Sequence, residues 1–283
     1  MFRKLIKYEW KNNAGLLGML SLAAVGVAIL GTVLLRVLIN YSDEIVASNA
    51  PSALIFLPLG LLLAFCFLAL ALYAAAVTIL LLYRFYKNKF TGEGYLTFTL
   101  PVRPSAIFLS SALVILLWQV ISMVLVVTLL GAMLFIGTAQ NGFVNREIWE
   151  EIRAVSQDFS DIFLDFGREM GSGYGILMIL SLIITPIYGI VSNMTWITVG
   201  AVLAKKHKIL AAIGLAYAGN MVVNILSSVV TMFPTILTLS SHNQPVEAYF
   251  TISSALQLAI YLGLTVGGYF LSTGLMKHKL NLP

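Results

Sequence analysis

The sequence contains little charge and almost no cysteine. Of its 283 residues, 10% are charged and only one, Cys66, is a cysteine. Soluble domains carry roughly 25% charged residues, and a soluble fold with 59% apolar residues would expose large patches that aggregate. A single cysteine permits neither an internal disulfide nor a cysteine-based metal cluster. The composition therefore excludes a soluble enzyme, a secreted disulfide-stabilised domain and a disordered chain, and it indicates a polytopic helical membrane protein.

Common catalytic and nucleotide-binding motifs are also missing. The chain has no Gly-x-x-x-x-Gly-Lys-Ser/Thr segment to hold ATP phosphates, no His-Glu-x-x-His, no Cys-x-x-Cys and no Gly-x-Ser-x-Gly. Its three histidines, His207, His242 and His278, are far apart in the sequence and lie outside the apolar runs. We therefore expect no catalytic residue, no metal site and no cofactor in this chain.

Long uncharged runs are what the sequence does have. A helix that crosses a bilayer needs about 20 mostly apolar residues, and six runs are long enough. The fold class that follows is an all-α polytopic membrane protein, with residues 1–283 as a single transmembrane domain. The predicted spans are about 14–38, 53–83, 107–137, 174–203, 209–236 and 250–275.

The positions of lysine and arginine predict the orientation, since cytoplasmic loops carry an excess of both. Thirteen of the seventeen fall on one side of the predicted spans: Arg3, Lys4, Lys7, Lys11, Arg84, Lys87, Lys89, Arg103, Lys205, Lys206, Lys208, Lys277 and Lys279. The other side carries Arg36, Arg146, Arg153 and Arg168. We expect both termini to be cytoplasmic, which requires an even number of spans, and we expect lipid rather than nucleic acid to meet the basic residues.

Residues 1–13 are predicted to form an interfacial helix before the first span. Apolar side chains fall on one face at helical spacing, at Phe2, Leu5, Ile6 and Trp10. Cations fall on the other face, at Arg3, Lys4, Lys7 and Lys11. This pattern is typical of a helix that lies in the membrane interface with its cations toward lipid headgroups. The alternative is a basic segment that only sets the orientation.

The cytoplasmic loop 84–106, between spans two and three, is rich in glycine and aromatic residues. Gly92 and Gly94 flank Glu93 and are expected to end the preceding helix. Apolar side chains follow in a region that ought to be solvated, at Tyr95, Leu96, Phe98 and Leu100. Such a patch favours either a docking surface for another protein or a loop that lies against the headgroups.

Two segments of the chain resemble bacterial ATP-binding-cassette (ABC) export permeases of the type 2 family. The first is Leu5-Ile6-Lys7-Tyr8-Glu9-Trp10, and the second runs from Arg84-Phe85-Tyr86-Lys87-Asn88 through Gly92-Glu93-Gly94-Tyr95-Leu96 to Thr97-Phe98-Thr99-Leu100-Pro101-Val102. The resemblance implies a six-span subunit of the bacterial cytoplasmic membrane. It also implies that a coupling helix in loop 84–106 inserts into a separate ATPase subunit that holds ATP and magnesium. The residues expected to make this contact are Arg84, Glu93, Gly94, Tyr95, Leu96, Leu100, Pro101 and Arg103.

The outer loop 138–173 is predicted to contain an amphipathic helix. Apolar residues recur at steps of three and four, at Ile148, Ile152, Val155, Phe159, Ile162 or Phe163, and Phe166. Charged residues fill the other faces. This helix either covers the outer mouth of a path and moves during release, or rests on the membrane or on a partner protomer.

Uncharged polar residues are the candidates for a substrate path. None of the six predicted cores contains Asp, Glu, Lys or His, as a proton- or ion-coupled carrier would require. The cores do contain Gln119, Asn193, Asn220 and Asn224, which either line a path or hydrogen-bond one helix to another. Gly263 and Gly267 in the sixth span have the Gly-x-x-x-Gly spacing of close helix contacts, within one protomer or between two.

Together these features predict the permease subunit of an ATP-driven exporter, without enzymatic activity of its own. Two permease protomers, identical or homologous, would work with two ATPase subunits. The uncharged interior favours an amphipathic or hydrophobic cargo. Within that class, the resemblance implies export of an antimicrobial or toxin-like peptide, with a drug or a lipid as the alternative. The rival interpretations are a membrane scaffold or sensor that does not transport, and a secondary carrier.

Overall fold

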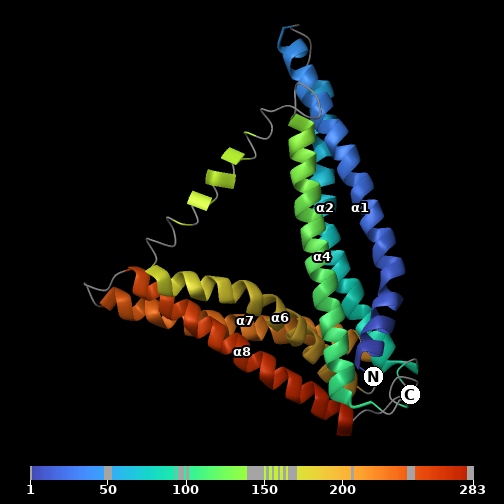
Figure 1. Cartoon of the computed structure of the whole chain (residues 1–283), viewed down its shortest axis with the longest axis vertical. Helices are drawn as coiled ribbons and strands as arrows, with labels where there is room; N and C mark the ends of the chain where they lie inside the picture. Colours follow the sequence, from blue (N-terminus) through green and yellow to red (C-terminus); the bar gives the residue numbers. More distant parts are fainter. Residues whose placement is uncertain are drawn as a thin grey trace. The chain divides into compact units, whose positions relative to one another are not determined.

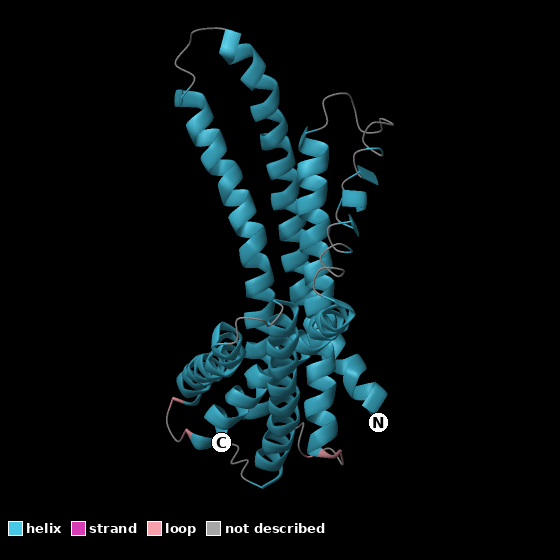
Figure 2. Ribbon diagram, turned by 90° about the vertical axis from the view of Figure 1, so that its left-hand side faces the viewer, coloured by secondary structure: helices cyan, strands magenta, loops and turns pink. Residues whose placement is uncertain are grey.

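Every regular element that the structure describes is a helix. The computed structural model describes residues 2–47, 53–92, 94, 99, 102–138, 150, 153–154, 156–158, 160–161, 164, 171–204, 207–240 and 246–278. Figure 2 shows no strand among them. The six long helices are α1 (Phe2–Ala47), α2 (Ala53–Phe90), α4 (Pro104–Thr138), α6 (Gly171–Leu203), α7 (Lys208–Ser240) and α8 (Val246–His278). The prediction of an all-α fold with six long apolar helices is confirmed.

All six helices are long and apolar enough to cross a bilayer, which indicates a multi-pass membrane protein. Large apolar side chains stay exposed along them, as expected where lipid is the solvent. The helices extend beyond the predicted spans, and α1 is continuous from Phe2, so the predicted interfacial segment and the first span form one helix. In loop 138–173, the described residues from 150 to 164 have helical backbone, and the apolar residues of the predicted amphipathic helix lie outside the described residues.

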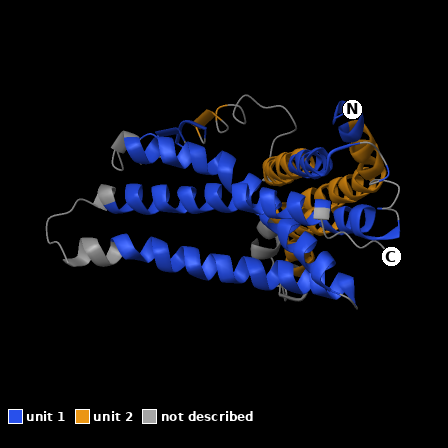
Figure 3. Ribbon diagram, turned by 90° about the horizontal axis from the view of Figure 1, so that it is seen from below, with its two compact units in different colours: residues 1–6, 82–116, 156–283 blue, residues 7–81, 117–155 orange. Residues whose placement is uncertain are grey.

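The chain divides into two compact units, which Figure 3 colours separately. The first, which we name the α1–α2–α4 unit, comprises residues 7–81 and 117–155. The second, the α6–α7–α8 unit, comprises residues 1–6, 82–116 and 156–283. Because α2 and α4 run through both divisions, the ends of these helices that flank loop 84–106 belong to the α6–α7–α8 unit.

In the α1–α2–α4 unit, polar and aromatic pairs connect the three helices. The Ser21 hydroxyl of α1 lies 2.9 Å from the Tyr73 hydroxyl of α2. The Trp10 and Trp118 rings of α1 and α4 stack with centroids 4.7 Å apart, a geometry that contributes about 0.5–1.5 kcal/mol beyond the area it buries. Gly31 of α1 allows close approach, since a Cβ there would lie 2.7 Å from the Met133 sulfur.

In the α6–α7–α8 unit, α6 packs against both of its neighbours, and Figure 1 shows the three helices side by side. Gly200 of α6 meets the backbone of α7, since a Cβ at Gly200 would lie 2.6 Å from the Cα of Ala212. On the other side of α6, the Ser272 hydroxyl of α8 donates a hydrogen bond to the Thr195 hydroxyl at 3.1 Å. Small residues therefore set the close spacing of this unit.

Packing along α6 is uneven. No residue from 173 to 187 is buried, whereas most residues from Tyr188 to Ala201 are. The change falls at Pro186, whose missing N–H leaves the Leu182 carbonyl without its helical donor. The half of α6 that follows Pro186 is therefore packed more closely against its neighbours than the half that precedes Pro186, where Tyr174 still contacts Phe250 of α8 with ring centroids 5.9 Å apart.

Candidate coupling loop and candidate substrate path

The structure describes three of the eight predicted coupling residues. Arg84 is half-buried in the last turns of α2, Arg103 is exposed directly before α4, and Gly94 lies between them. The other five, Glu93, Tyr95, Leu96, Leu100 and Pro101, lie outside the described residues. The helix preceding the loop ends at Phe90, close to where the glycines were expected to end it.

Backbone hydrogen bonds define both sides of the loop. The Gly94 amide donates to the Thr91 carbonyl at 2.8 Å, which closes a turn after α2. The Arg103 carbonyl accepts from the amides of Ala106 and Ile107 at 2.9 and 3.3 Å. Pro104 stands at the first position of α4, where its missing N–H costs no hydrogen bond. These contacts fix the residues at which the chain leaves α2 and enters α4.

An aromatic cluster joins the two sides of the loop to α8. We name it the base cluster, and its members are Phe85, Tyr86 and Phe90 of α2, Phe108 of α4 and Tyr269 of α8. Phe108 is only 1% exposed, and its ring centroid lies 6.3 Å from that of Phe85 and 6.0 Å from that of Tyr269. Phe90 lies 5.8 Å from Phe85 and 6.1 Å from Tyr86. The base cluster therefore packs both helices that flank the loop with the last span.

Sequence reasoning missed the base cluster. Phe85, Tyr86 and Phe90 stand among Arg84, Lys87 and Lys89, so the segment resembles a basic membrane flank with interfacial aromatics. One sequence signal could have distinguished a packed cluster from such a flank. Three aromatic residues stand close together at the end of one span, and Phe108 stands at the start of the next. Their partner Tyr269 is too far along the chain to be found without the fold.

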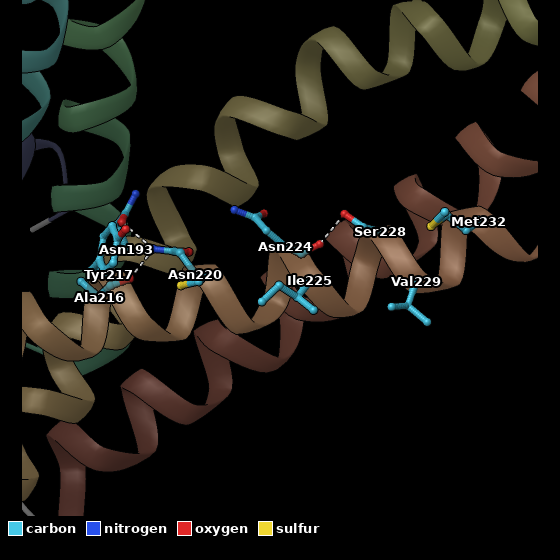
Figure 4. Close-up of a pocket in the computed structure, with 10 residues that line it drawn as sticks. Asn193, Ala216, Tyr217, Asn220, Asn224, Ile225, Ser228, Val229 and Met232 are labelled. Atoms are coloured by element: carbon cyan, nitrogen blue, oxygen red, sulfur yellow. Dashed lines mark hydrogen bonds between the residues drawn. The ribbon is translucent and has the colours of Figure 1, made fainter.

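Three of the four predicted path residues line one groove. Asn193 of α6 and Asn220 and Asn224 of α7 border a hollow of about 740 Å³ that follows α7, here named the α7 groove (Figure 4). The rest of its lining is largely apolar and includes Tyr217, Met221, Ile225 and Met232. The groove offers a surface for an amphipathic molecule, with amides at one side and apolar side chains along its length.

The amide of Asn220 is occupied by a hydrogen-bond network. Its Nδ2 donates to Asn193 Oδ1 and to the Ala216 carbonyl, both at 2.8 Å. Its Oδ1 accepts from the Ser192 hydroxyl at 2.6 Å. Asn193 in turn donates to the Gly189 carbonyl at 2.8 Å. Asn193 and Asn220 therefore connect α6 with α7, which is the role that the sequence left open beside lining a path.

Asn224 stands one turn further along α7 and differs from Asn220. It is exposed, and none of the described residues hydrogen-bonds its side-chain amide. Only its backbone carbonyl accepts a bond, from the Ser228 hydroxyl at 2.8 Å. Of the three asparagines in the groove, Asn224 is the one whose amide is available to a ligand.

Gln119 lies apart from the asparagines, in the α1–α2–α4 unit. Its Nε2 donates to the Thr78 hydroxyl at 3.2 Å, which joins α4 to α2. Its Oε1 is buried and finds no protein partner, and the same holds for Trp118 Nε1 and Ser122 Oγ on neighbouring turns of α4. The structure thus places Gln119 in a helix contact and does not bring it into the α7 groove.

Among the residues that the structure describes, no three His, Cys, Asp or Glu side chains come together in a way that could hold a metal ion. The candidate site therefore consists of a loop with a packed aromatic base and of a groove with one available amide. Comparisons of the chain with protein-family models, with curated proteins and with solved structures find no match.

Proposed function

We propose that this chain is the membrane permease subunit of an ATP-binding-cassette exporter. The observation that carries the proposal is the sequence of loop 84–106, which combines the family-like segment with a group of apolar residues between two long spans. The base cluster supports it, because a loop that transmits force to membrane helices needs a rigid attachment to them. A separate ATPase subunit would bind the loop and hydrolyse ATP.

The cargo of the proposed exporter is an amphipathic or hydrophobic molecule, such as an antimicrobial or toxin-like peptide. The α7 groove supports this class, since it combines amides with a long apolar lining and includes no charged side chain. A drug or a lipid fits the same description. An ion or a free sugar does not, because the groove lacks the charge or the dense hydrogen bonding that would replace water around it.

The proposal is tested by purifying the chain in mild detergent with its ATPase subunit and measuring ATP hydrolysis in proteoliposomes. Replacing Glu93→Gln or Tyr95→Ala should abolish the stimulation of the ATPase by the permease, because both residues belong to the segment expected to enter it. Membrane insertion should be unchanged. Lys277→Gln, a charge change at the end of α8, serves as the matched control and should leave stimulation intact.

Three results would contradict the proposal. Unchanged stimulation in the Glu93 and Tyr95 variants would remove the role of the loop. Transport that survives ATP depletion and stops when the proton gradient is dissipated would instead identify a secondary carrier. A chain that binds the ATPase with no transport of any cargo would support the scaffold or sensor.

A further inference from the structure

A second hollow lies between α6 and α8, in the part of α6 that precedes Pro186. It has a volume of about 210 Å³ and belongs entirely to the α6–α7–α8 unit. The residues of α6 that line it run from Tyr174 to Thr185, a distance of about 17 Å at 1.5 Å per residue. The hydrocarbon core is about 30 Å thick, so the hollow extends from one end of these spans toward their middle.

The lining of this α6–α8 cavity is unusually polar for a hollow between two membrane-spanning helices. Its six polar side chains are Tyr174, Ser181, Thr185, Ser254, Gln257 and Tyr261. None of them is an acid or a base, and the three other lining residues are apolar. The cavity therefore presents hydrogen-bond donors and acceptors without a net charge, which suits a neutral polar molecule and not an ion.

Two of the hydroxyls in this cavity lack protein partners. Serine and threonine in a helix ordinarily donate back to a carbonyl three or four residues earlier, as Ser181 does to Met178 at 2.7 Å and Thr265 does to Tyr261 at 2.6 Å. Among the described residues, nothing hydrogen-bonds the Thr185 or the Ser254 hydroxyl. In hydrocarbon an unmade hydrogen bond of this kind is costly.

The two unpartnered hydroxyls come from different helices. Thr185 belongs to α6 and Ser254 to α8, and both line the same cavity. Gln257 adds an amide whose Nε2 donates to the Tyr261 hydroxyl at 3.0 Å. A water molecule fills about 30 Å³ in the liquid and needs two to four polar partners, so the cavity has both the room and the partners for several.

We propose that the α6–α8 cavity is a hydrated binding site, which takes water and small uncharged molecules that carry hydroxyl or amide groups. Such an occupant supplies the hydrogen bonds that Thr185 and Ser254 do not find in the protein. Loose packing of α6 before Pro186 leaves room for the occupant to enter. The site is separate from the α7 groove, and the inference does not depend on the export function proposed above.

Cysteine labelling in membranes tests whether the cavity is hydrated. Thr185→Cys and Ser254→Cys are introduced separately into a Cys66→Ala chain, and their rates of reaction with N-ethylmaleimide are measured. Only the thiolate reacts, and a thiol in hydrocarbon does not ionise. The matched controls are Ile183→Cys and Ile252→Cys, two residues away on exposed apolar positions of the same helices that do not line the cavity.

We expect the cavity cysteines to react about tenfold faster or more than the controls, since a rise of one unit in pKa removes nine-tenths of the thiolate at neutral pH. Equal rates at the four positions would overturn the proposal, because the cavity would then be no better hydrated than the exposed apolar faces of the same helices. A second measurement compares glycerol with sucrose at equal osmolality. Glycerol should slow the labelling of Ser254→Cys more than sucrose does, and identical rates would overturn the claim that small polar molecules enter.

The two proposals can fail independently. Fast labelling of the cavity cysteines in a chain that stimulates no ATPase would leave the hydrated site intact and remove the exporter. Stimulation of an ATPase in a chain whose cavity cysteines do not react would do the opposite.

Discussion

Two asparagines one turn apart on α7 have different surroundings. Asn220 uses its amide in bonds to Ser192, Asn193 and the Ala216 carbonyl, whereas the Asn224 amide has no bond to any described residue. Both border the α7 groove. Replacing Asn220 therefore tests the contact between α6 and α7, and replacing Asn224 tests the contact between the groove and a bound molecule.

Asn220→Ala is expected to lower the thermal midpoint of the detergent-solubilised protein. The change removes side-chain bonds between two membrane helices, each of which contributes about 0.6 kcal/mol on average and at most about 1.7. The free energy of unfolding should therefore fall by about 1–2 kcal/mol in total. Thermal unfolding followed by size-exclusion chromatography measures it.

Asn224→Ala is the matched variant. It should change the free energy of unfolding by less than about 0.5 kcal/mol and leave the midpoint nearly unchanged, because it removes no side-chain hydrogen bond and no buried side chain. It should reduce transport if the cargo contacts the groove. A midpoint that falls as far as that of Asn220→Ala would show that Asn224 has a structural partner after all.

The sequence identifies individual polar residues well and their partners poorly. Asn193, Asn220 and Asn224 are conspicuous because polar side chains are rare in apolar spans. Which of them would pair depended on the register between α6 and α7, which no local pattern encodes.

The contacts of the glycines were equally hard to predict from the sequence. Gly263 and Gly267 have the expected spacing, yet a Cβ at either would meet nothing within 4 Å, while the neighbouring Gly268 packs against Thr195.

At the scale of helices, Gly200 allows the backbones of α6 and α7 to approach closely. A Cβ at Gly200 would lie 2.6 Å from the Ala212 Cα and 2.8 Å from the Ala211 carbonyl oxygen. Both are backbone atoms, which cannot turn aside as a flexible side chain can. Gly189, in the same helix, has nothing within 4 Å of the equivalent position.

Gly200→Ala should therefore destabilise the protein by about 1–3 kcal/mol, the usual cost of overpacking. Gly189→Ala should be neutral or should stabilise by up to about 1 kcal/mol, since alanine favours helix over glycine. Thermal midpoints of the two variants in the same detergent check the prediction. Equal midpoints would mean that α6 and α7 lie further apart than the structure has them.

Helix positions and several helix ends, such as Ala53 and Leu203, could be predicted, whereas the ends of α1 could not. Apolar runs place the six spans because the bilayer selects for hydrophobicity over about 20 residues. Hydropathy says nothing of a helix that continues into polar sequence, as α1 does at both ends, from Phe2 and through to Ala47. The loop 84–106 could be recognised by its residues, whereas the base cluster needed α8, which is distant in sequence.

For the molecule as a whole, the distribution of basic residues predicts which way the helices run. Green fluorescent protein fused to either terminus should fluoresce, because it folds in the cytoplasm. Alkaline phosphatase inserted after Gln140 should be active, because this enzyme needs the oxidising outer compartment for its disulfides.

Opposite behaviour of the two terminal fusions would require an odd number of spans and would contradict the orientation. Inactive phosphatase in loop 138–173, with both termini cytoplasmic, would mean that this loop does not cross to the other side. An N-terminal fusion that does not fluoresce would also place loop 84–106, two spans further on, out of the reach of a cytoplasmic ATPase.

The change in packing at Pro186 determines which substitutions the two halves of α6 can tolerate during evolution. Most substitutions between Tyr188 and Ala201 meet closely packed neighbours, with Gly189 as an exception, so few alternatives there preserve the fold. Before Pro186, apolar residues that face lipid can replace one another freely, with the polar residues of the cavity as the exceptions. Among descendants of this sequence, one half of a single helix is therefore expected to stay nearly constant while the other half drifts.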